Sequence, residues 1–473
     1  MKSITKYKYI VILSAAVLVT GCGVVTKKYK SKELSQEQSD KLYRDQQSQD
    51  TVSMADLKWK EVFSDPHLQQ LIEEGLANNY DLKNSILNIA QAEASFRQSK
   101  LAFLPSLSFV PQVTHNKSSQ QALNFPSNVN INLKTTTVQL GFATNWEIDV
   151  WGKLSSAKRA ALANYLQLDA TKRAVETSLI ATIATSYYTL LALDKQLKIT
   201  EETILIREKS VKALKALNEA GNVTGADVVQ SEASLYAAKV TIPELKQSIR
   251  EMENQICLLT GKMPKSVERG IIDDQHLDLD LKLGVPMLLL KNRPDVEAAE
   301  MSLRQAYENT NVAKAQFYPS LTITSASGGI SALTTRDLFS NSVFYNIVAG
   351  ITQPIFNRGQ IRTNYKIAKA KQEQAFNTFE KSLLTAGIEV SDALYAYEIS
   401  KEKQETRKLQ VEALEKAVRF NMRLLEFSSN TNYTDVLTSE QSLITSQLSE
   451  VNDQLLQLKA TINLYRALGG GWK

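Results

Sequence analysis

The side chains that most often do chemistry in enzymes are few in this chain and stand far apart. Its three histidines, His67, His115 and His276, show no spacing that would bring them to one metal ion. We find no Ser/His/Asp or Cys/His arrangement and no glycine-rich loop for a phosphate. The sequence therefore predicts a protein that is not an enzyme and has no metal site and no cofactor.

One residue with a clear chemical role is Cys22. After a start that contains three lysines, an apolar run over residues 9–19 leads into Val19-Thr20-Gly21-Cys22. These are features of a secretory signal, and the run is shorter than the roughly 20 residues of a membrane-spanning helix. The placement of the cysteine resembles a bacterial lipoprotein signal, which predicts a signal peptide over 1–21 and a lipid on the Cys22 thiol. A signal peptide with an incidental cysteine is the alternative.

Composition excludes several other classes. The 473 residues carry a formal net charge of +5, and three of those charges belong to the signal, so nothing indicates nucleic-acid binding. Cys257 is left without a cysteine partner and lies in an apolar run, as a buried core residue would. Residues 22–55 are polar and mixed in charge, which predicts an extended N-terminal tether.

The rest of the chain is an internal repeat. Short motifs of the first half return about 210 residues later, which predicts two repeats over 56–265 and 266–473. The paired motifs are Pro105-Ser106-Leu107 with Pro319-Ser320-Leu321, Asp227-Val228 with Asp435-Val436, and Leu259-Thr260-Gly261 with Leu468-Gly469-Gly470.

Each repeat has the same order of elements: a moderate helix, two strands, a very long helix, a tight turn and a return helix. The long helices have almost no Gly or Pro and would approach 100 Å, so their apolar faces must pack against other long helices. Pro243 predicts a kink or break in the first return helix. The predicted helices span 81–101, 154–220, 226–260, 294–316, 360–427 and 433–468.

The strands alternate apolar and small or polar side chains, most clearly over 135–146 and 343–352. This pattern fits a transmembrane β-strand and equally a half-buried soluble strand. Four strands are too few for a membrane barrel, and an open sheet in lipid leaves backbone groups unpaired. In a membrane the strands must therefore close with those of other copies, although the sequence alone does not set their number.

Motifs along nearly the whole mature chain resemble TolC-like outer-membrane factors of the OprM/NodT lipoprotein branch. The resemblance implies a mostly α fold with a small transmembrane β part: a trimeric, twelve-stranded β-barrel continued by a long periplasmic α-helical barrel. It also implies an equatorial belt formed by residues 56–80, residues 270–293 and the C-terminus. The motifs are Cys22, Trp59 with 63–68 and 79–82, the two Pro-Ser-Leu sequences, 146–152, Gly221 with Asp227-Val228, 292–296 and 353–359.

The function that this resemblance implies is the outer-membrane channel of a tripartite efflux system. Such a homotrimer would be a passive export duct for drugs or other small molecules, joined by a periplasmic adaptor to an inner-membrane pump of the resistance-nodulation-division type. Gly23 stands where an aspartate would signal inner-membrane retention, so the resemblance favours the outer membrane. The alternative is a structural or adhesive coiled-coil lipoprotein of the envelope, which has no evident use for the strands.

By resemblance, Asp227 and Asp435 form a periplasmic gate, where three copies would place rings of carboxylates that favour cations. The alternative is that both are first-turn acids stabilised by the helix dipole. Thr431 stands where some relatives have an arginine, which puts a salt-bridge latch in doubt. The implied adaptor docking tips, which are also ordinary turn residues, are Gly221, Asn222, Val223, Thr224, Ser428, Ser429, Asn430 and Thr431.

Overall fold

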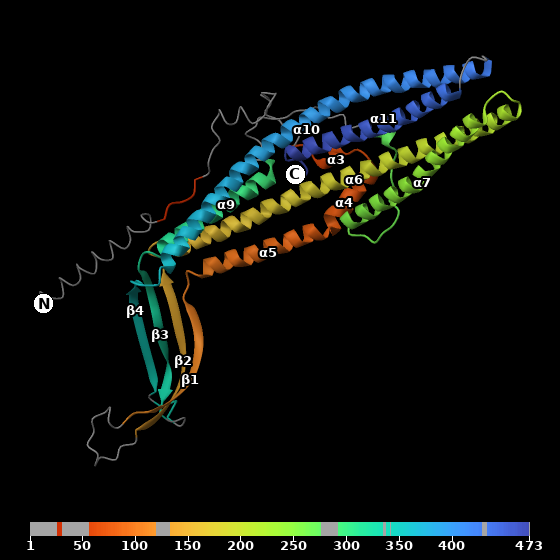
Figure 1. Cartoon of the computed structure of the whole chain (residues 1–473). Helices are drawn as coiled ribbons and strands as arrows, with labels where there is room; N and C mark the ends of the chain where they lie inside the picture. The colour runs from red at the N-terminus through yellow and green to blue at the C-terminus, as the bar shows by residue number, and fades with distance from the viewer. Residues whose placement is uncertain are drawn as a thin grey trace, which may run out of the picture. The chain divides into compact units, whose positions relative to one another are not determined.

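The computed structural model describes residues 26–30, 56–119, 133–275, 292–333, 337–340, 342–427 and 433–472 (Figure 1). Most of these residues are helical, and four strands form one antiparallel sheet in the order β1-β2-β3-β4. This confirms the predicted mostly α fold with a small β part. Two compact units divide the chain: the first contains Met1–Ser31, Ile89–Gln167 and Ala299–Thr378, and the second contains Lys32–Asn88, Leu168–Ala298 and Phe379–Lys473.

The sheet belongs to the first unit. Its strands are β1 (Ser106–Lys117), β2 (Lys134–Ile148), β3 (Ser320–Ala332) and β4 (Val343–Thr352). Because each strand pairs only with its neighbours in this order, β1 and β4 are edge strands whose outer backbone groups have no strand partner within the described chain.

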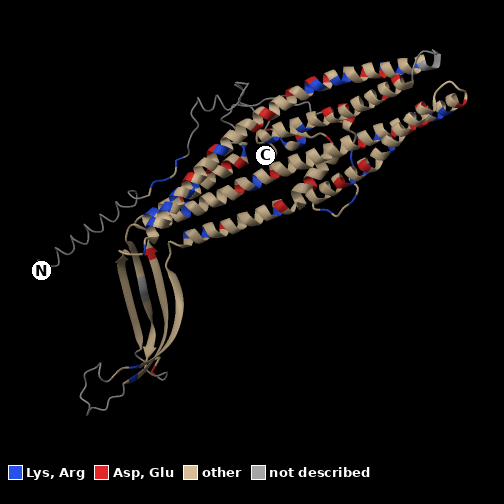
Figure 2. Cartoon of the chain, in the orientation of Figure 1, with Lys and Arg blue, Asp and Glu red and all other residues tan. Residues whose placement is uncertain are grey.

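One face of the sheet presents apolar side chains at alternate positions to solvent. Along β4 the most exposed large apolar side chains stand at even spacings, as the sequence pattern predicted, and their exposed fractions are 68–83%. Figure 2 shows that the strands carry few charges compared with the helices. A single chain leaves this apolar surface uncovered. Its members include Leu107, Phe109 and Val113 of β1 and Val343, Tyr345, Ile347 and Ile351 of β4.

The long helices are α6 (Lys153–Glu219), with 67 residues, and α10 (Gln360–Phe427), with 68 residues. At about 1.5 Å per residue each is close to 100 Å long. The side chain of Asp149 caps the first turn of α6. Its carboxylate accepts hydrogen bonds from the backbone N–H groups of Leu154 (2.9 Å) and Ser155 (2.8 Å). The shorter helices α5 (Tyr80–Leu101) and α9 (Pro294–Ala315) also lie within one residue of their predicted bounds.

The return helices are α7 (Gly225–Leu259) and α11 (Tyr433–Ala467). A kink or break was expected at Pro243, and α7 continues through the proline as one helix, so there is no break. Proline removes one backbone hydrogen bond, but α7 buries side chains on both sides of it, Leu235 before and Ile249 after. That packing keeps the two halves of α7 in one helix.

The second unit contains the short elements α3 (Trp59–Val62), α4 (Pro66–Asn78) and η3 (Ile272–Asp274). The C-terminal part of the chain forms hydrogen bonds with the segments that were expected to form an equatorial belt. Residues 276–291 of that expected belt lie outside the described chain. The hydrogen bonds run from Tyr465 Oη to Leu57 O (2.7 Å), from Gln454 Nε2 to Ile272 O (3.0 Å) and from Trp472 Nε1 to Asn292 O (3.0 Å).

Candidate gate and docking site at the hairpin turns

The turn between α6 and α7 is a well-formed helix stop. Gly221 has a φ of 74°, a conformation that costs a glycine little, and its N–H donates to Asn218 O (2.9 Å). The next N–H, of Asn222, reaches back to Leu217 O (2.9 Å), and Asn218 Nδ2 donates to Val223 O (2.8 Å). The predicted docking tip is therefore a defined, largely exposed turn in the second unit, and turn chemistry explains its glycine.

Asp227 lies in the first turn of α7 and forms a capping box with Thr224. Its carboxylate accepts from Thr224 N (2.9 Å) and Thr224 Oγ1 (2.6 Å), while Asp227 N donates weakly to Thr224 Oγ1 (3.3 Å). The helix-capping alternative for Asp227 is thus present in the structure. These capping contacts do not exclude an electrostatic role for the same side chain.

Asp435 occupies the equivalent first turn of α11 and is exposed. Its backbone oxygen accepts a hydrogen bond from Asn421 Nδ2 of α10 (3.3 Å), which ties the two helices of the second hairpin together. The second docking tip, Ser428 to Thr431, lies outside the described residues.

An apolar cluster packs the two acid-bearing turns against each other within the second unit. Leu214 of α6 and Tyr433 and Val436 of α11 form its buried centre, and Val223 and Val228 of the first hairpin pack on it. Each acid is thus flanked by residues of one shared cluster, and in Figure 1 the hairpin ends lie at the same end of the long helices. Asp227 and Asp435 are held in neighbouring turns, which a gate built from both requires.

Sequence reasoning missed a buried polar group just beyond this cluster. Glu440 of α11 is 5% exposed and Arg207 of α6 is 6% exposed. The signal was in the sequence: Tyr433, Val436 and Glu440 are spaced i, i+3, i+7 on a helix and share one face. An acid on an otherwise apolar stripe predicts a buried carboxylate.

Cys22 lies outside the described residues, but the chain that follows it is held in the first unit. Asn311 Nδ2 of α9 donates to Lys27 O (2.9 Å), and the rings of Tyr29 and Tyr307 meet edge to face at 5.7 Å. Burial raises the pKa of the Tyr29 phenol to about 12. At least these few tether residues are therefore packed against α9, which the polar composition of 22–55 did not predict.

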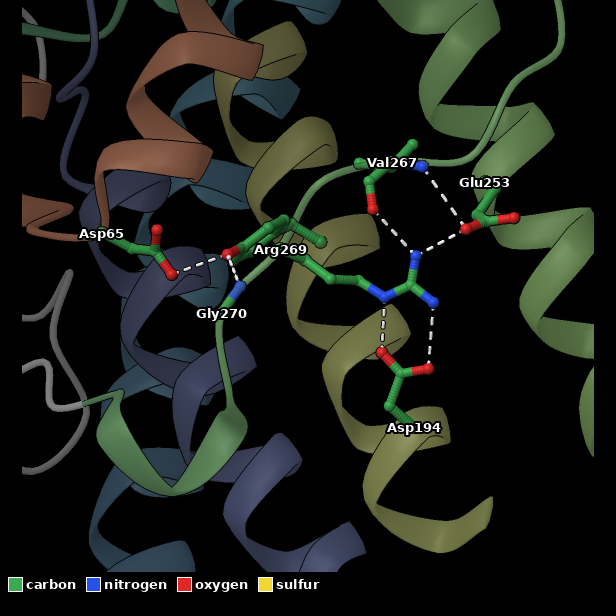
Figure 3. A network of polar contacts seen from close by, with 7 residues as sticks. Asp65, Asp194, Glu253, Val267, Arg269 and Gly270 are labelled. Atoms are coloured by element: carbon green, nitrogen blue, oxygen red, sulfur yellow. Dashed lines mark hydrogen bonds and ion pairs between the residues drawn. The ribbon is translucent and has the colours of Figure 1, made fainter. Parts of the chain in front are cut away.

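A polar network joins α6 and α7, the two helices of the first hairpin, in the second unit (Figure 3). Arg269 binds both carboxylate oxygens of Asp194 on α6 (2.5 and 3.0 Å) and Glu253 Oε1 on α7 (2.5 Å). Beside it, Tyr187 Oη donates to Asp65 Oδ2 (2.6 Å) and accepts from Gly270 N (3.0 Å). The network joins the interior of α6 to the C-terminal end of α7, so it fixes the pairing of the two helices far from their turn.

Neither metal ligation nor a helical membrane crossing is indicated. In the part of the chain that the structure describes, no three His, Cys, Asp or Glu side chains form a group that could hold a metal ion. None of the described helices has the length and apolarity needed to cross a membrane.

Long paired helices, a small antiparallel sheet with an apolar face, and acid-bearing hairpin turns are features expected of an outer-membrane channel protein. A family model described as "Outer membrane efflux protein" matches residues 71–262 and 285–470, and the chain belongs to that family. The predicted family and the predicted function of an outer-membrane efflux channel are confirmed.

Among characterised relatives, the chain is 29% identical over 435 residues to "Toluene efflux pump outer membrane protein TtgC" of Pseudomonas putida, covering 91% of this chain and 88% of that protein. "Pyoverdine export outer membrane protein OpmQ" of the same species is 28% identical over 423 residues, covering 89% of each chain.

Solved structures agree with the fold. The chain superposes on the outer-membrane channel OprN with a TM-score of 0.84 at 24% identity, covering 95% of this chain and 99% of that one. The open state of the Neisseria gonorrhoeae MtrE channel gives a TM-score of 0.83 at 25% identity over the same shares.

Proposed function

We propose that this protein is the passive outer-membrane duct of a tripartite efflux system, in which three copies close one pore. Small molecules enter from an inner-membrane pump through a periplasmic adaptor and leave at the cell surface. The duct performs no chemistry of its own, and the partner pump supplies the energy. The relatives' names, which include toluene efflux and pyoverdine export, support small-molecule cargo as a class and do not single out one compound.

The observation that supports this function best is the sheet of the first unit. It has two edge strands, β1 and β4, and an apolar face that one chain leaves exposed. In hydrocarbon an unpaired strand edge costs several kcal/mol for each unsatisfied group. Pairing β4 of one copy with β1 of the next removes both edges, and three copies of the sheet reach about twelve strands, a common size for a membrane barrel.

The finer assignments are part of the same proposal. The pump is of the resistance-nodulation-division type, and the adaptor meets the turns of both hairpins, Gly221 to Thr224 and Ser428 to Thr431. A lipid on Cys22 is a second membrane anchor beside the β-barrel. The contacts of Lys27 and Tyr29 with α9 support a short tether between Cys22 and this helix. The repeat boundaries, 56–265 and 266–473, are supported by the two separately matched segments.

Asp227 and Asp435 form the periplasmic gate. The shared apolar cluster holds their turns together, so that a threefold assembly repeats the pair around one axis. Rings of carboxylates at a constriction attract cations and repel anions. The absence of an arginine at Thr431 leaves this gate dependent on carboxylates and apolar packing rather than on a salt bridge at that position.

Cross-linking of strand edges tests the proposed closure. One cysteine replaces Val110 of β1, and a second replaces Phe344, Tyr345 or Asn346 of β4 in turn, because the register between copies has to be found. Oxidation in outer-membrane fragments is expected to give a ladder that ends at three copies for at least one pair. The control places both cysteines on the adjacent strands β1 and β2, where only intrachain bonds are expected. A ladder absent from every pair, or one ending at two copies, would contradict a closed trimer.

A further inference from the structure

A carboxylate is buried where the two hairpins of one chain meet. Glu440 of α11 is 5% exposed, and neither of its carboxylate oxygens has a hydrogen-bond partner among the described residues. Burying an ionised carboxylate without a donor costs several kcal/mol, so such a group normally finds a partner or holds a proton. Glu440 stands just over one helical turn beyond Asp435, and therefore close to the proposed gate.

Arg207 joins three helices beside this carboxylate. Its guanidinium donates to the backbone oxygen of Ser234 on α7 and to Gln441 Oε1 on α11 (2.8 Å), while its own backbone belongs to α6. Its Nε is buried without a partner. Nearby, Ser231 Oγ of α7 and Tyr433 Oη of α11 share a hydrogen bond of 3.1 Å. These contacts are the polar part of the packing that holds α11 on the first hairpin.

The surroundings of Glu440 favour its protonated form more than water does. Burial raises the pKa of this carboxyl, and the positive charge of Arg207 opposes that rise only in part. Arg207 is the one charged group among the described residues whose field reaches Glu440; α7 presents the neutral Ser231 and Ser234, and α11 itself presents Tyr433. Burial also raises the pKa of the Tyr433 phenol, so that group stays neutral.

We propose that Glu440 and Arg207 form a proton-dependent lock between α11 and the α6–α7 hairpin, one that is closed while Glu440 is neutral and released when it ionises. With a neutral Glu440, Arg207 keeps its bonds to Ser234 and Gln441 and the interface stays packed. Ionisation places a carboxylate without a hydrogen-bond donor in the interface, and Arg207 offsets only part of the cost of burying it. Moving α11 away from the first hairpin hydrates that charge, so the separated state becomes favourable. This lock deepens the proposed function, on which it rests, by setting when the hairpins can part.

The direction of the pH dependence follows from linkage. Because the packed state has the higher Glu440 pKa, it binds more protons than the separated state between the two pKa values. The stabilising effect of the packed state is complete below the pKa of the hydrated carboxyl. It is lost as the pH rises through the pKa of the packed one. The hairpins are therefore expected to part more readily as the pH rises.

Distance measurement tests the lock directly. Spin labels are placed at the exposed positions Val229 on α7 and Thr438 on α11 in a Cys257→Ser background, with trimers diluted by unlabelled protein. Electron–electron double resonance measures the distance between the two labels. In the native protein this distance is expected to increase as the pH rises from about 5 to about 9. Glu440→Gln is expected to lose this shift and stay short. Glu412→Gln, at an exposed acid of α10, is the matched control and is expected to behave as native.

Two results would overturn the lock: native distances that do not change with pH, or a Glu440→Gln protein that shifts as the native one does. Glu440→Leu serves as a second neutral variant if the glutamine packs poorly, and it too is expected to stay short. Conductance recorded in parallel separates this inference from the proposed function. Normal conductance without a distance shift removes the lock and leaves the duct, whereas a distance shift without conductance removes the duct.

Discussion

Asp227 combines two properties that sequence reasoning had set against each other. It caps its own helix through Thr224, and it places a carboxylate at the turn where a channel constriction is proposed. A charge at a helix N-terminus stabilises by about 0.3–1 kcal/mol, which is too little to exclude a second role. Asp435 stands in the equivalent turn, packed on the same apolar cluster through Val436.

Replacing both Asp227 and Asp435 with alanine tests their electrostatic role. Six carboxylates disappear from a trimer, so we expect conductance in planar bilayers to rise and the preference for cations to weaken. Reversal potentials in a salt gradient measure the selectivity. Thr224→Ala is the control, because it removes the capping hydroxyl, at a cost of about 1 kcal/mol, but keeps both charges. If the double variant matched the native protein, both acids would be helix-capping residues only.

Glu440 shows what single-residue reasoning could and could not predict. Its spacing from Tyr433 and Val436 places it on the buried face of α11, and that much was readable from the sequence. Its neighbour Arg207 lies more than two hundred residues earlier, on α6. No local pattern pairs residues so far apart, so the cluster appears only when three helices are assembled.

The central strand pair depends on one close backbone approach. A Cβ atom at Gly329 of β3 would lie 2.2 Å from Leu140 O of β2, much closer than any contact allows. We therefore expect Gly329→Ala to force β2 and β3 apart, at a cost of about 1–3 kcal/mol, and to lower the temperature at which the trimer dissociates in detergent. Gly350→Ala on β4 is the control, because nothing lies within 4 Å of its added Cβ. Equal loss in both variants would contradict this account of the strand pairing.

Helices and strands were predictable to within a few residues where one local rule governed them. The long helices follow from stretches nearly free of glycine and proline, and β4 follows from strict alternation. At Pro243 the local rule predicted a kink or break, and α7 continues without a break because packing on both sides of the proline outweighs its local cost. Local sequence rules also did not predict that Lys27 and Tyr29 pack on α9, because those contacts join segments that are distant in sequence.

For the whole molecule, the unpaired edges of the sheet indicate that several copies of the chain assemble. A sequence can predict that four strands are too few for a barrel, because backbone groups in hydrocarbon must be paired whatever the side chains are. It cannot set the number of copies, since that depends on strand tilt and on packing between chains. The structure leads to the same requirement for further copies of the chain. The apolar face that includes β1 and β4 is uncovered, and both sheet edges are unpaired within the described chain.

If three copies close one pore, the protein forms an open path for small molecules across a membrane. Single-channel recording of the purified full-length protein in planar lipid bilayers tests it most directly. The account predicts stepwise conductance that favours cations and rises when Asp227 and Asp435 are both replaced with alanine. A purified trimer that inserts into the bilayer and never conducts would contradict the account and favour a structural lipoprotein of the envelope.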